Sequence, residues 1–398
     1  MDPAMPSIRC QAAILMVWLI SVARAEPEFL GQGSLPGNMR DLSKLKGKDA
    51  QGIPHDRLGG MGSAIDYTGK DNTYILASDR GPGDGASDYR CRVHRMEITV
   101  KPGAGQPVSM RLLSTTLLSG PGGATLTGSK KPGPARFDPE GIRMGRGGTF
   151  FISDEYGPAI AEFSPRGEWI RKLAVPANYL PEIISESPMG ELPPANNRGR
   201  QPNRGMEGLA ISADGKTLFG IMQSPLIQDG ALDATGKRVG RLCRMVAIGI
   251  GTGAAREYAY RLDNPSHGVN EILAAGPDSF LVIERDGLAG KEAKAKKIHW
   301  TTIRGASEIT RMVALPERKA SAEIAPMPKR VLIDLLDPRY GLAGASFPEK
   351  IEGLAFGPDL PDGRKLLLVT ADNDFVAEAP FRVFAFAVSA LDLAFAKP

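Results

Sequence analysis

The stretch NRGMEGLAISADGKTLFGIMQSPL, from Asn203 to Leu226, decides the fold of this chain. It contains a short apolar run, an Asp-Gly turn and a second apolar run, which is the pattern of a β-hairpin. Glu207 stands at the start of the first run, beside residues expected to be buried. The same arrangement recurs in DPEGIRM at Asp138, VNEILAA at Val269 and KIEGLAF at Lys350. A weaker copy begins at Gly62, where Gly62 or Ser63 takes the place of the glutamate.

Each of these hairpins is followed by further strand patterns, and no helical periodicity interrupts them. Regular four-stranded antiparallel units predict an all-β fold, a β-propeller. We count five blades, and a sixth is possible in the spans 101–137, 178–204 or 286–330. The last unit shows only three strands, ending in FRVFAFAV. The segment EFLGQG, Glu28 to Gly33, is expected to supply the fourth and so close the ring by joining the two ends of the chain.

The N-terminus has the features of a secretory signal peptide. Arg9 precedes the apolar stretch AAILMVWLISVA, and Ala-Arg-Ala ends at Ala25. This pattern predicts cleavage after Ala25 and a periplasmic or secreted protein, with residues 26–398 as a single propeller domain. The alternative, a membrane anchor, is disfavoured by the short apolar core. After cleavage we expect no stable membrane insertion, and a monomer.

Composition and cysteine placement narrow the functions further. Lysine and arginine number 49 against 45 acidic residues, a balance that does not favour nucleic acid as a partner. Cys91 and Cys243 fall in blades one and three, too far apart for a disulfide, so we expect two unpaired thiols. No G-x-S-x-G sequence is present.

The repeat geometry gathers acidic side chains on one face of the ring. The inner strand of a blade starts at the face where the second strand ends, so both positions meet at the mouth of the central channel. Crowded carboxylates favour a bound cation, and Ca²⁺ takes about six to eight oxygen ligands. The expected metal ligands are Glu140, Glu207, Glu271, Glu352, Asp79, Asp286 and Asp372.

An architectural role is the alternative for each of these glutamates. A carboxylate at the mouth of an inner strand can accept backbone N–H groups from the next blade and lock the two blades together. The sequence leaves both possibilities open.

Four motifs together resemble a known family. DPEGIRM, FISDEYGPAIAEFSPRG, NRGMEGLAISADGKTLFGIMQSPLIQDG and KIEGLAFGPDLPDGRKLLLVTADND are similar to the phytase-like family, "esterase-like activity of phytase", of exported bacterial proteins. The resemblance covers most of residues 55–390. It implies a β-propeller and hydrolase activity, with small phosphate esters as the expected substrates.

The leading hypothesis is therefore an exported, metal-dependent hydrolase of phosphoric esters, in which Ca²⁺ activates a water molecule. Arg80 and Arg285 are expected to hold phosphate oxygens, and Asp154 and Glu155 complete the residues expected to act on the substrate. The main alternative is a non-catalytic periplasmic propeller that binds a ligand or protein, with a structural metal. A carboxylic-ester hydrolase is a third possibility, although the missing nucleophile motif disfavours its usual mechanism.

Overall fold

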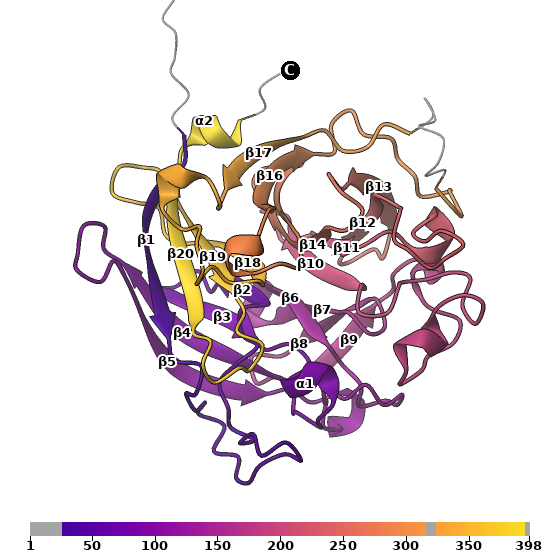
Figure 1. The fold of residues 1–398 in the computed structure, drawn as a ribbon, viewed down its shortest axis with the longest axis horizontal. Coiled ribbons are helices and arrows are strands. Elements are labelled where there is room, and N and C mark those ends of the chain that lie inside the picture. The colour runs from indigo at the N-terminus through magenta and orange to yellow at the C-terminus, as the bar shows by residue number, and fades with distance from the viewer. Residues whose placement is uncertain (1–25, 316–323, 395–398) are drawn as a thin grey trace, which may run out of the picture.

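Twenty strands form five four-stranded antiparallel sheets arranged in a ring, as Figure 1 shows. The computed structural model describes residues 26–315 and 324–394, so the expected signal peptide, residues 1–25, lies outside the described residues. The first blade contains β2 (Ala64–Tyr67), β3 (Thr73–Ala77), β4 (Arg92–Val100) and β5 (Val108–Leu117). The second contains β6 (Pro139–Met144), β7 (Phe150–Asp154), β8 (Ala159–Phe163) and β9 (Trp169–Leu173).

The remaining blades repeat this order. The third contains β10 (Met206–Ile211), β11 (Thr217–Met222), β12 (Leu242–Gly249) and β13 (Ala255–Arg261). The fourth contains β14 (Gly268–Ala274), β15 (Ser279–Arg285), β16 (Lys296–Thr302) and β17 (Lys329–Asp334). The fifth contains β18 (Ile351–Phe356), β19 (Lys365–Ala371), β20 (Phe381–Val388) and β1 (Glu28–Leu35). The predicted β-propeller is confirmed, with five blades among the described residues.

The ring closes through its two ends, as predicted. β1 pairs antiparallel with β20, and Glu28 lies opposite Ala387. Each inner strand (β2, β6, β10, β14 and β18) contacts the inner strands of both neighbouring blades. Among the residues that the structure describes, helix is confined to two short segments, α1 (Pro82–Gly85) and α2 (Ala390–Leu393), and a few 3₁₀ turns. No helix in the described part of the chain is long and apolar enough to cross a membrane.

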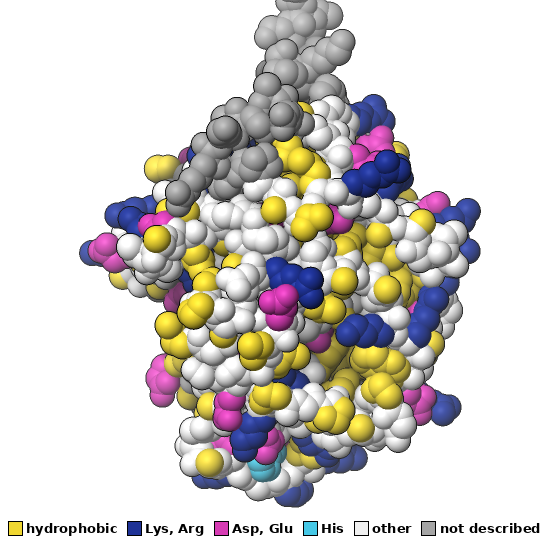
Figure 2. Space-filling model, turned by 90° about the vertical axis from the view of Figure 1, so that its right-hand side faces the viewer, with side chains coloured by type: hydrophobic (Ala, Val, Ile, Leu, Met, Phe, Trp, Pro, Cys, Tyr) yellow, Lys and Arg dark blue, Asp and Glu magenta, His cyan; other side chains and the backbone are white. Residues whose placement is uncertain are grey.

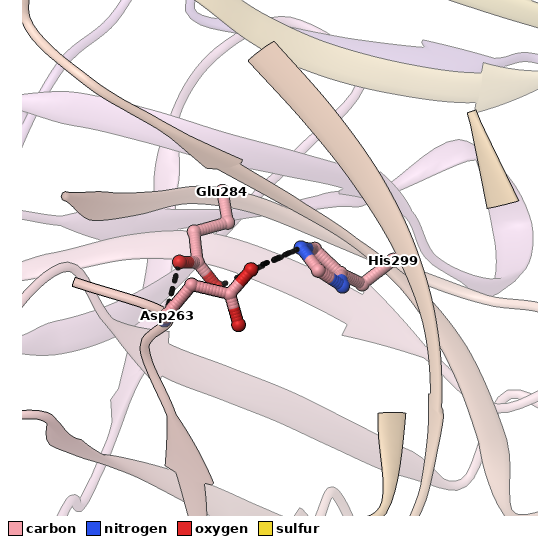
Figure 3. A group of neighbouring side chains, drawn as sticks. All are labelled: Asp263, Glu284 and His299. Atoms are coloured by element: carbon pink, nitrogen blue, oxygen red, sulfur yellow. Dashed lines mark hydrogen bonds and ion pairs between the residues drawn. The ribbon is translucent and has the colours of Figure 1, made fainter. Parts of the chain in front are cut away.

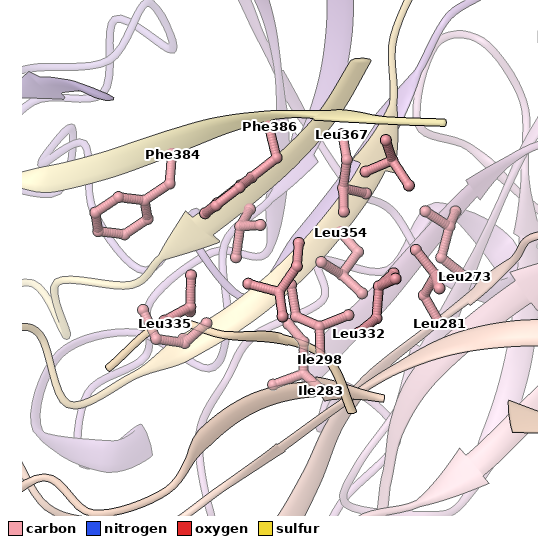
Figure 4. Close-up of a cluster of buried hydrophobic side chains, with 14 of the residues drawn as sticks. Leu273, Leu281, Ile283, Ile298, Leu332, Leu335, Leu354, Leu367, Phe384 and Phe386 are labelled. Carbon is pink, nitrogen blue, oxygen red and sulfur yellow. The ribbon is translucent and has the colours of Figure 1, made fainter. Parts of the chain in front are cut away.

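The hydrophobic core is divided among the five interfaces between blades. Between blades four and five, Leu281 and Ile298 pack with Leu354 and Phe384, as Figure 4 shows. Successive side chains of a strand point to opposite faces of its sheet. Each sheet therefore presents an apolar face to each of its two neighbouring blades, and the ring buries both faces. Cys91 and Cys243 are buried in such interfaces, and both are free thiols, as predicted.

Charged side chains of both signs are interspersed with hydrophobic ones over the side of the ring drawn in Figure 2. We call "entry face" the face at which the inner strands begin and the second strands, β3, β7, β11, β15 and β19, end. The loop 178–204, one of the spans considered for a sixth blade, forms 3₁₀ turns at Ala177–Tyr179 and Pro188–Glu191 instead of strands.

Candidate functional site

A β-bulge places one polar residue of each of four inner strands at the mouth of the channel. The pairing with the second strand shifts register between Met206 and Gly208, and between Ile351 and Gly353, so Glu207 and Glu352 are the bulged residues. Glu140 lies in the corresponding bulge of β6. A bulge adds one unpaired residue and redirects its side chain. These three glutamates are nine-tenths or more buried and belong to three different blades.

In blade four this position belongs to Asn270. The register shift in β14 falls between Val269 and Glu271, so Asn270 corresponds to Glu207 and Glu271 corresponds to Gly208. Alignment of the repeats on their glutamates pairs Glu271 with Glu207, which is one residue away from the structural equivalence. Alignment on the apolar residues that follow would have placed Asn270 at the mouth.

The glycine after each mouth glutamate is required by the neighbouring blade. A Cβ on Gly208 would lie 2.6 Å from the backbone nitrogen of Ile272, and one on Gly141 would lie 2.7 Å from that of Leu209. These distances are too short for any side chain. The Glu-Gly pair thus combines a polar group at the mouth with close packing of adjacent inner strands.

Glu271 makes the contacts of a lock between blades. Its Oε1 accepts hydrogen bonds from the N–H groups of Leu209, in blade three, and Ile272, at 3.1 and 2.9 Å. Its Oε2 lies 2.9 Å from Nη2 of Arg143. Burial raises the pKa of Glu271 to about 7, although Arg143 and the two N–H groups oppose the shift. The structure thus shows for Glu271 the architectural geometry that the sequence left open.

Arg143 crosses the interior of the ring just below the mouth. Its Nη1 donates to the carbonyl of Ile65 in blade one at 2.8 Å, and its Nη2 donates to that of Ile272 in blade four at 2.9 Å. The side chain is 1% exposed. The guanidinium therefore ties three inner strands together, and the mouth glutamates stand above a layer of paired charges.

The mouth carboxylates, by contrast, repel one another. Burial raises the pKa of Glu140 well above its ordinary value, and repulsion from Glu207 adds to this. Burial likewise raises the pKa of Glu207, with further contributions from Glu155 and Glu352. Glu207 accepts a hydrogen bond from the Gln223 amide, and Glu352 accepts one from Arg285 at 2.6 Å. Like charges in a buried site favour a cation that would offset them.

Two groups of carboxylates adjoin the mouth. Asp138, Glu140 and Glu155 each bring one oxygen to within 4.8 Å of the others, and Asp79, Asp372 and Asp374 do the same. Asp138 was not among the residues singled out from the sequence, although it opens the DPEG motif.

Each of these groups already holds a cationic side chain. Arg80 donates from Nη1 to Asp138 at 2.9 Å and to Glu155 at 3.0 Å. In the other group, Lys350 lies 2.7 Å from Asp374 and 4.0 Å from Asp79. Arg80 thus serves as a counter-ion for the carboxylates beside the mouth.

Asp154 and Asp286 shape loops. Oδ1 of Asp154 accepts the N–H groups of Asp138 and Tyr156 at 3.0 and 3.1 Å. Oδ2 of Asp286 accepts those of Lys294 and Ala295 at 2.7 and 2.9 Å. Both carboxylates therefore have their oxygens turned toward their own loops, away from the group of mouth glutamates.

Arg204 has fewer partners than Arg80 or Arg285. Its Nη1 donates to Ser224 Oγ at 3.2 Å, and it forms no ion pair with any residue in the ranges 26–315 and 324–394. Burial lowers the pKa of Arg204 to about 10, and repulsion from Arg238 and Arg285 adds to the effect. A positive excess thus lies beside the acidic mouth.

Asn270 also lacks partners. It is 3% exposed, and neither the nitrogen nor the oxygen of its amide has a hydrogen-bond partner among the described residues. A buried amide without partners is costly, and a bound ligand or ion would satisfy it. Like Asp138, Asn270 is missing from the set of residues predicted from the sequence to form the site.

A second buried carboxylate cluster lies away from the channel, between blades three and four. Figure 3 shows Asp263, Glu284 and His299 pointing toward one another. Nζ of Lys329 lies 2.8 Å from Asp263 and 2.6 Å from Glu284, so the cation beside these carboxylates is a side chain of the protein. Although burial opposes it, the hydrogen bond from His267 and the charge of Lys329 lower the pKa of Glu284 to about 2. Lys329 thus offsets part of the negative charge of these two carboxylates.

Comparison with known proteins identifies a family and a relative. The model of the family described as "Phytase-like: Esterase-like activity of phytase" matches residues 56–375. A relative from Arthroderma benhamiae, described as "Uncharacterized secreted protein", is 27% identical over 374 residues, covering 75% of this chain and 71% of that protein.

Solved structures of low similarity were also found. The periplasmic gluconolactonase PpgL of Pseudomonas aeruginosa is 11% identical with a TM-score of 0.36, covering 90% of this chain and 97% of that chain. A glycoside hydrolase family 43 arabinoxylan arabinofuranohydrolase from Bacillus subtilis is 11% identical with a TM-score of 0.41, covering 82% of this chain and 62% of that chain.

Proposed function

The chain belongs to the phytase-like family, and from this premise we propose that it is an exported hydrolase of phosphoric esters that works with Ca²⁺ at the mouth of the channel. The observation that carries the proposal is the mouth itself. Three buried glutamates of different blades meet there with an amide that has no partner. Family membership alone supports a hydrolase-like propeller, and the phosphoric ester and the metal are the proposed additions.

The donor set fits a hard cation. Glu140, Glu207, Glu352 and Asn270 offer only oxygen ligands, which Ca²⁺ prefers, and a flexible ring of side chains suits its variable geometry. When bound, Ca²⁺ would supply charge that polarises the phosphoryl group and lowers the pKa of a coordinated water. Without the ion, burial and neighbouring carboxylates raise the pKa values of Glu140 and Glu207, which supports a site that a cation would stabilise.

The arginines beside the mouth would bind the phosphate. Arg204 has no carboxylate partner in the described structure, and Arg285 reaches the mouth through its bond to Glu352. Planar guanidinium groups bind phosphate oxygens in pairs. We therefore assign the phosphate to Arg204 and Arg285, and give Arg80 the role of holding Asp138 and Glu155 in place.

The proposed reaction needs no side-chain nucleophile. The oxygen of a water molecule attacks phosphorus, and the bond from phosphorus to the ester oxygen breaks. Glu140 is the carboxylate that would take the proton from the water and return a proton to the departing alkoxide. Water and ester thus give an alcohol and inorganic phosphate.

Export is part of the proposal. The features of residues 1–25 are those of a signal peptide, and the relative from Arthroderma benhamiae is described as secreted. We propose that the chain works in the periplasm or outside the cell as a monomer.

Turnover of p-nitrophenyl phosphate and phytate, with added Ca²⁺ and after chelation, tests the proposal. We expect turnover that chelation abolishes and that falls by at least about a hundredfold in Glu207→Gln and Glu140→Gln. Glu97→Gln, an exposed substitution in β4, is the matched control and should retain full activity. No turnover with any divalent ion would reject the hydrolase and leave the non-catalytic binding propeller, in which chelation lowers only the melting temperature.

A further inference from the structure

A pocket of about 590 Å³ opens on the entry face between the loops 188–202, 232–238 and 264–266. Its volume is within the range of about 300 to 1,000 Å³ that holds small organic ligands. The pocket lining is mostly apolar, and its apolar side chains are those of Pro188, Leu192, Pro202, Leu232 and Pro265. The two charged residues among the described residues lining it, Lys237 and Arg238, are both basic.

This pocket leads to the mouth of the channel along two chain segments. Pro202 stands two residues before Arg204, and Ser266 stands two residues before Gly268. A Cβ on Gly268 would lie 3.2 Å from Nη1 of Arg204 and 3.1 Å from Cγ of Gln223, so these side chains are packed together. Gln223 in turn donates to Glu207 at the mouth.

Arg204 and Arg238 lie between the apolar wall and the acidic mouth. Neither forms an ion pair with a residue that the structure describes. Repulsion from Arg238 contributes to the lowered pKa of Arg204. Two unpaired guanidinium groups next to a carbon-lined cavity are complementary to an organic anion. Its charged end would face the arginines and its apolar end the leucines and prolines.

A smaller basic cavity on the other side of Pro188 and Pro202 does not show this complementarity. It has a volume of about 110 Å³ and is lined by Arg136 and Arg200, among others. Both arginines face Glu191, at 3.6 and 2.5 Å. Both arginines thus share a carboxylate partner within the chain, unlike Arg204 and Arg238, which leaves the larger pocket as the better site for an anion.

We infer that the substrate is a phosphoric monoester of an apolar alcohol, with its phosphate at Arg204 and its alkyl or aryl part in the pocket lined by Leu192 and Leu232. This rests on the proposed function and names its substrate class. An inositol polyphosphate fits poorly, because several of its phosphate groups would lose water against proline and leucine side chains, and Lys237 and Arg238 can partner only some of them.

Binding of hexylphosphonate and ethylphosphonate to the mature chain tests the pocket without any turnover. The two probes carry the same charge and differ by four CH₂ groups, so burial of the longer chain should tighten binding by about tenfold or more. Isothermal titration calorimetry in the presence of Ca²⁺ measures both. Leu232→Asp and Leu192→Asp change half-exposed side chains and should each remove this preference. Val331→Asp, on the exposed side of β17, is the control and should keep it.

Hydrolysis of hexyl phosphate and ethyl phosphate, whose leaving groups have the same chemistry, separates the two proposals. A higher kcat/KM for hexyl phosphate that Leu232→Asp abolishes supports both. Preferential binding of hexylphosphonate without hydrolysis of any ester keeps the pocket and rejects the hydrolase. Equal binding of the two probes, unchanged preference in both leucine variants, or a higher kcat/KM for phytate than for hexyl phosphate would overturn the apolar pocket.

Discussion

Two groups of buried carboxylates in this ring have opposite electrostatics. Glu284, between blades three and four, accepts hydrogen bonds from His267, Lys329, Tyr260 and a backbone N–H. Its pKa is lowered to about 2. Glu207, at the mouth, has one amide donor and faces other carboxylates, and its pKa is raised. Both are buried to a similar extent. Burial alone therefore does not mark a functional carboxylate. The number of hydrogen-bond donors and cations around it distinguishes a structural carboxylate from a candidate site residue.

The largest expected effect comes from breaking a fully paired carboxylate. Arg143→Met leaves Glu271 buried without its ion pair and should lower the free energy of unfolding by about 3–5 kcal/mol. Urea unfolding measures the loss. Arg111→Met, which breaks the exposed pair with Glu97, should cost less than about 1 kcal/mol. Equal effects of the two substitutions would contradict the role of Arg143 in tying blades together.

Calcium should act on the mouth group alone. If the mouth holds Ca²⁺ in the folded state, a concentration about one hundred times the Kd should stabilise the protein by about 2.7 kcal/mol. Thermal unfolding with and without the ion measures this. Glu207→Gln should weaken the stabilisation, whereas Glu284→Gln should leave it intact. Calcium stabilisation that survives Glu207→Gln would place the ion elsewhere.

The two glutamine variants should also differ without calcium. Glu284→Gln removes a charged acceptor of several hydrogen bonds and should cost about 2 kcal/mol at pH 7. A lowered pKa contributes stability above the unfolded value of 4.5, and this is lost as pH falls toward 2, so the variant and the wild type should converge there. Glu207→Gln removes repulsion and should be neutral or stabilising. A large loss in Glu207→Gln would make that residue a structural lock.

The carboxylates that adjoin the mouth should also give the stability a pH slope. The pKa of Asp138 is raised to about 8, chiefly by burial, and that of Asp372 to about 6 for the same reason. Such groups hold protons in the folded state that they release on unfolding, so calcium-free stability should fall as pH rises from about 4 to 8. Each such proton contributes about 1.4 kcal/mol per pH unit. Melting temperatures across this range should flatten when Ca²⁺ is added, and an unchanged slope would contradict a cation at the mouth.

Much of the fold could be predicted from the sequence because it depends on local patterns. Hairpin turns and alternating apolar residues identified the blades, and the incomplete last blade required β1. The site was less accessible, because a bulge moves the equivalence by one residue. Glu271 and Asn270 exchanged roles for that reason alone.

Other contacts join strands that are far apart in the sequence, and no local pattern contains those distances. Arg143 reaches carbonyl groups in two other blades, and Lys329 reaches Glu284 from the outer strand of its own sheet. Alternation along β15 also turns Glu284 away from the side of Arg285. Residues adjacent in the sequence thus belong to two different clusters.

The pairing of β1 with β20 also has a kinetic consequence. These strands are more than 300 residues apart in the chain, so the ring gains its closing hydrogen bonds last, after the whole sequence is available. Bringing such distant segments together is slow because the loop entropy is lost before the contacts form. Until then β1 lacks its partner strand, which leaves it open to strands of other chains. The interval between synthesis of the first strand and that of the last is therefore when this protein is most prone to aggregate.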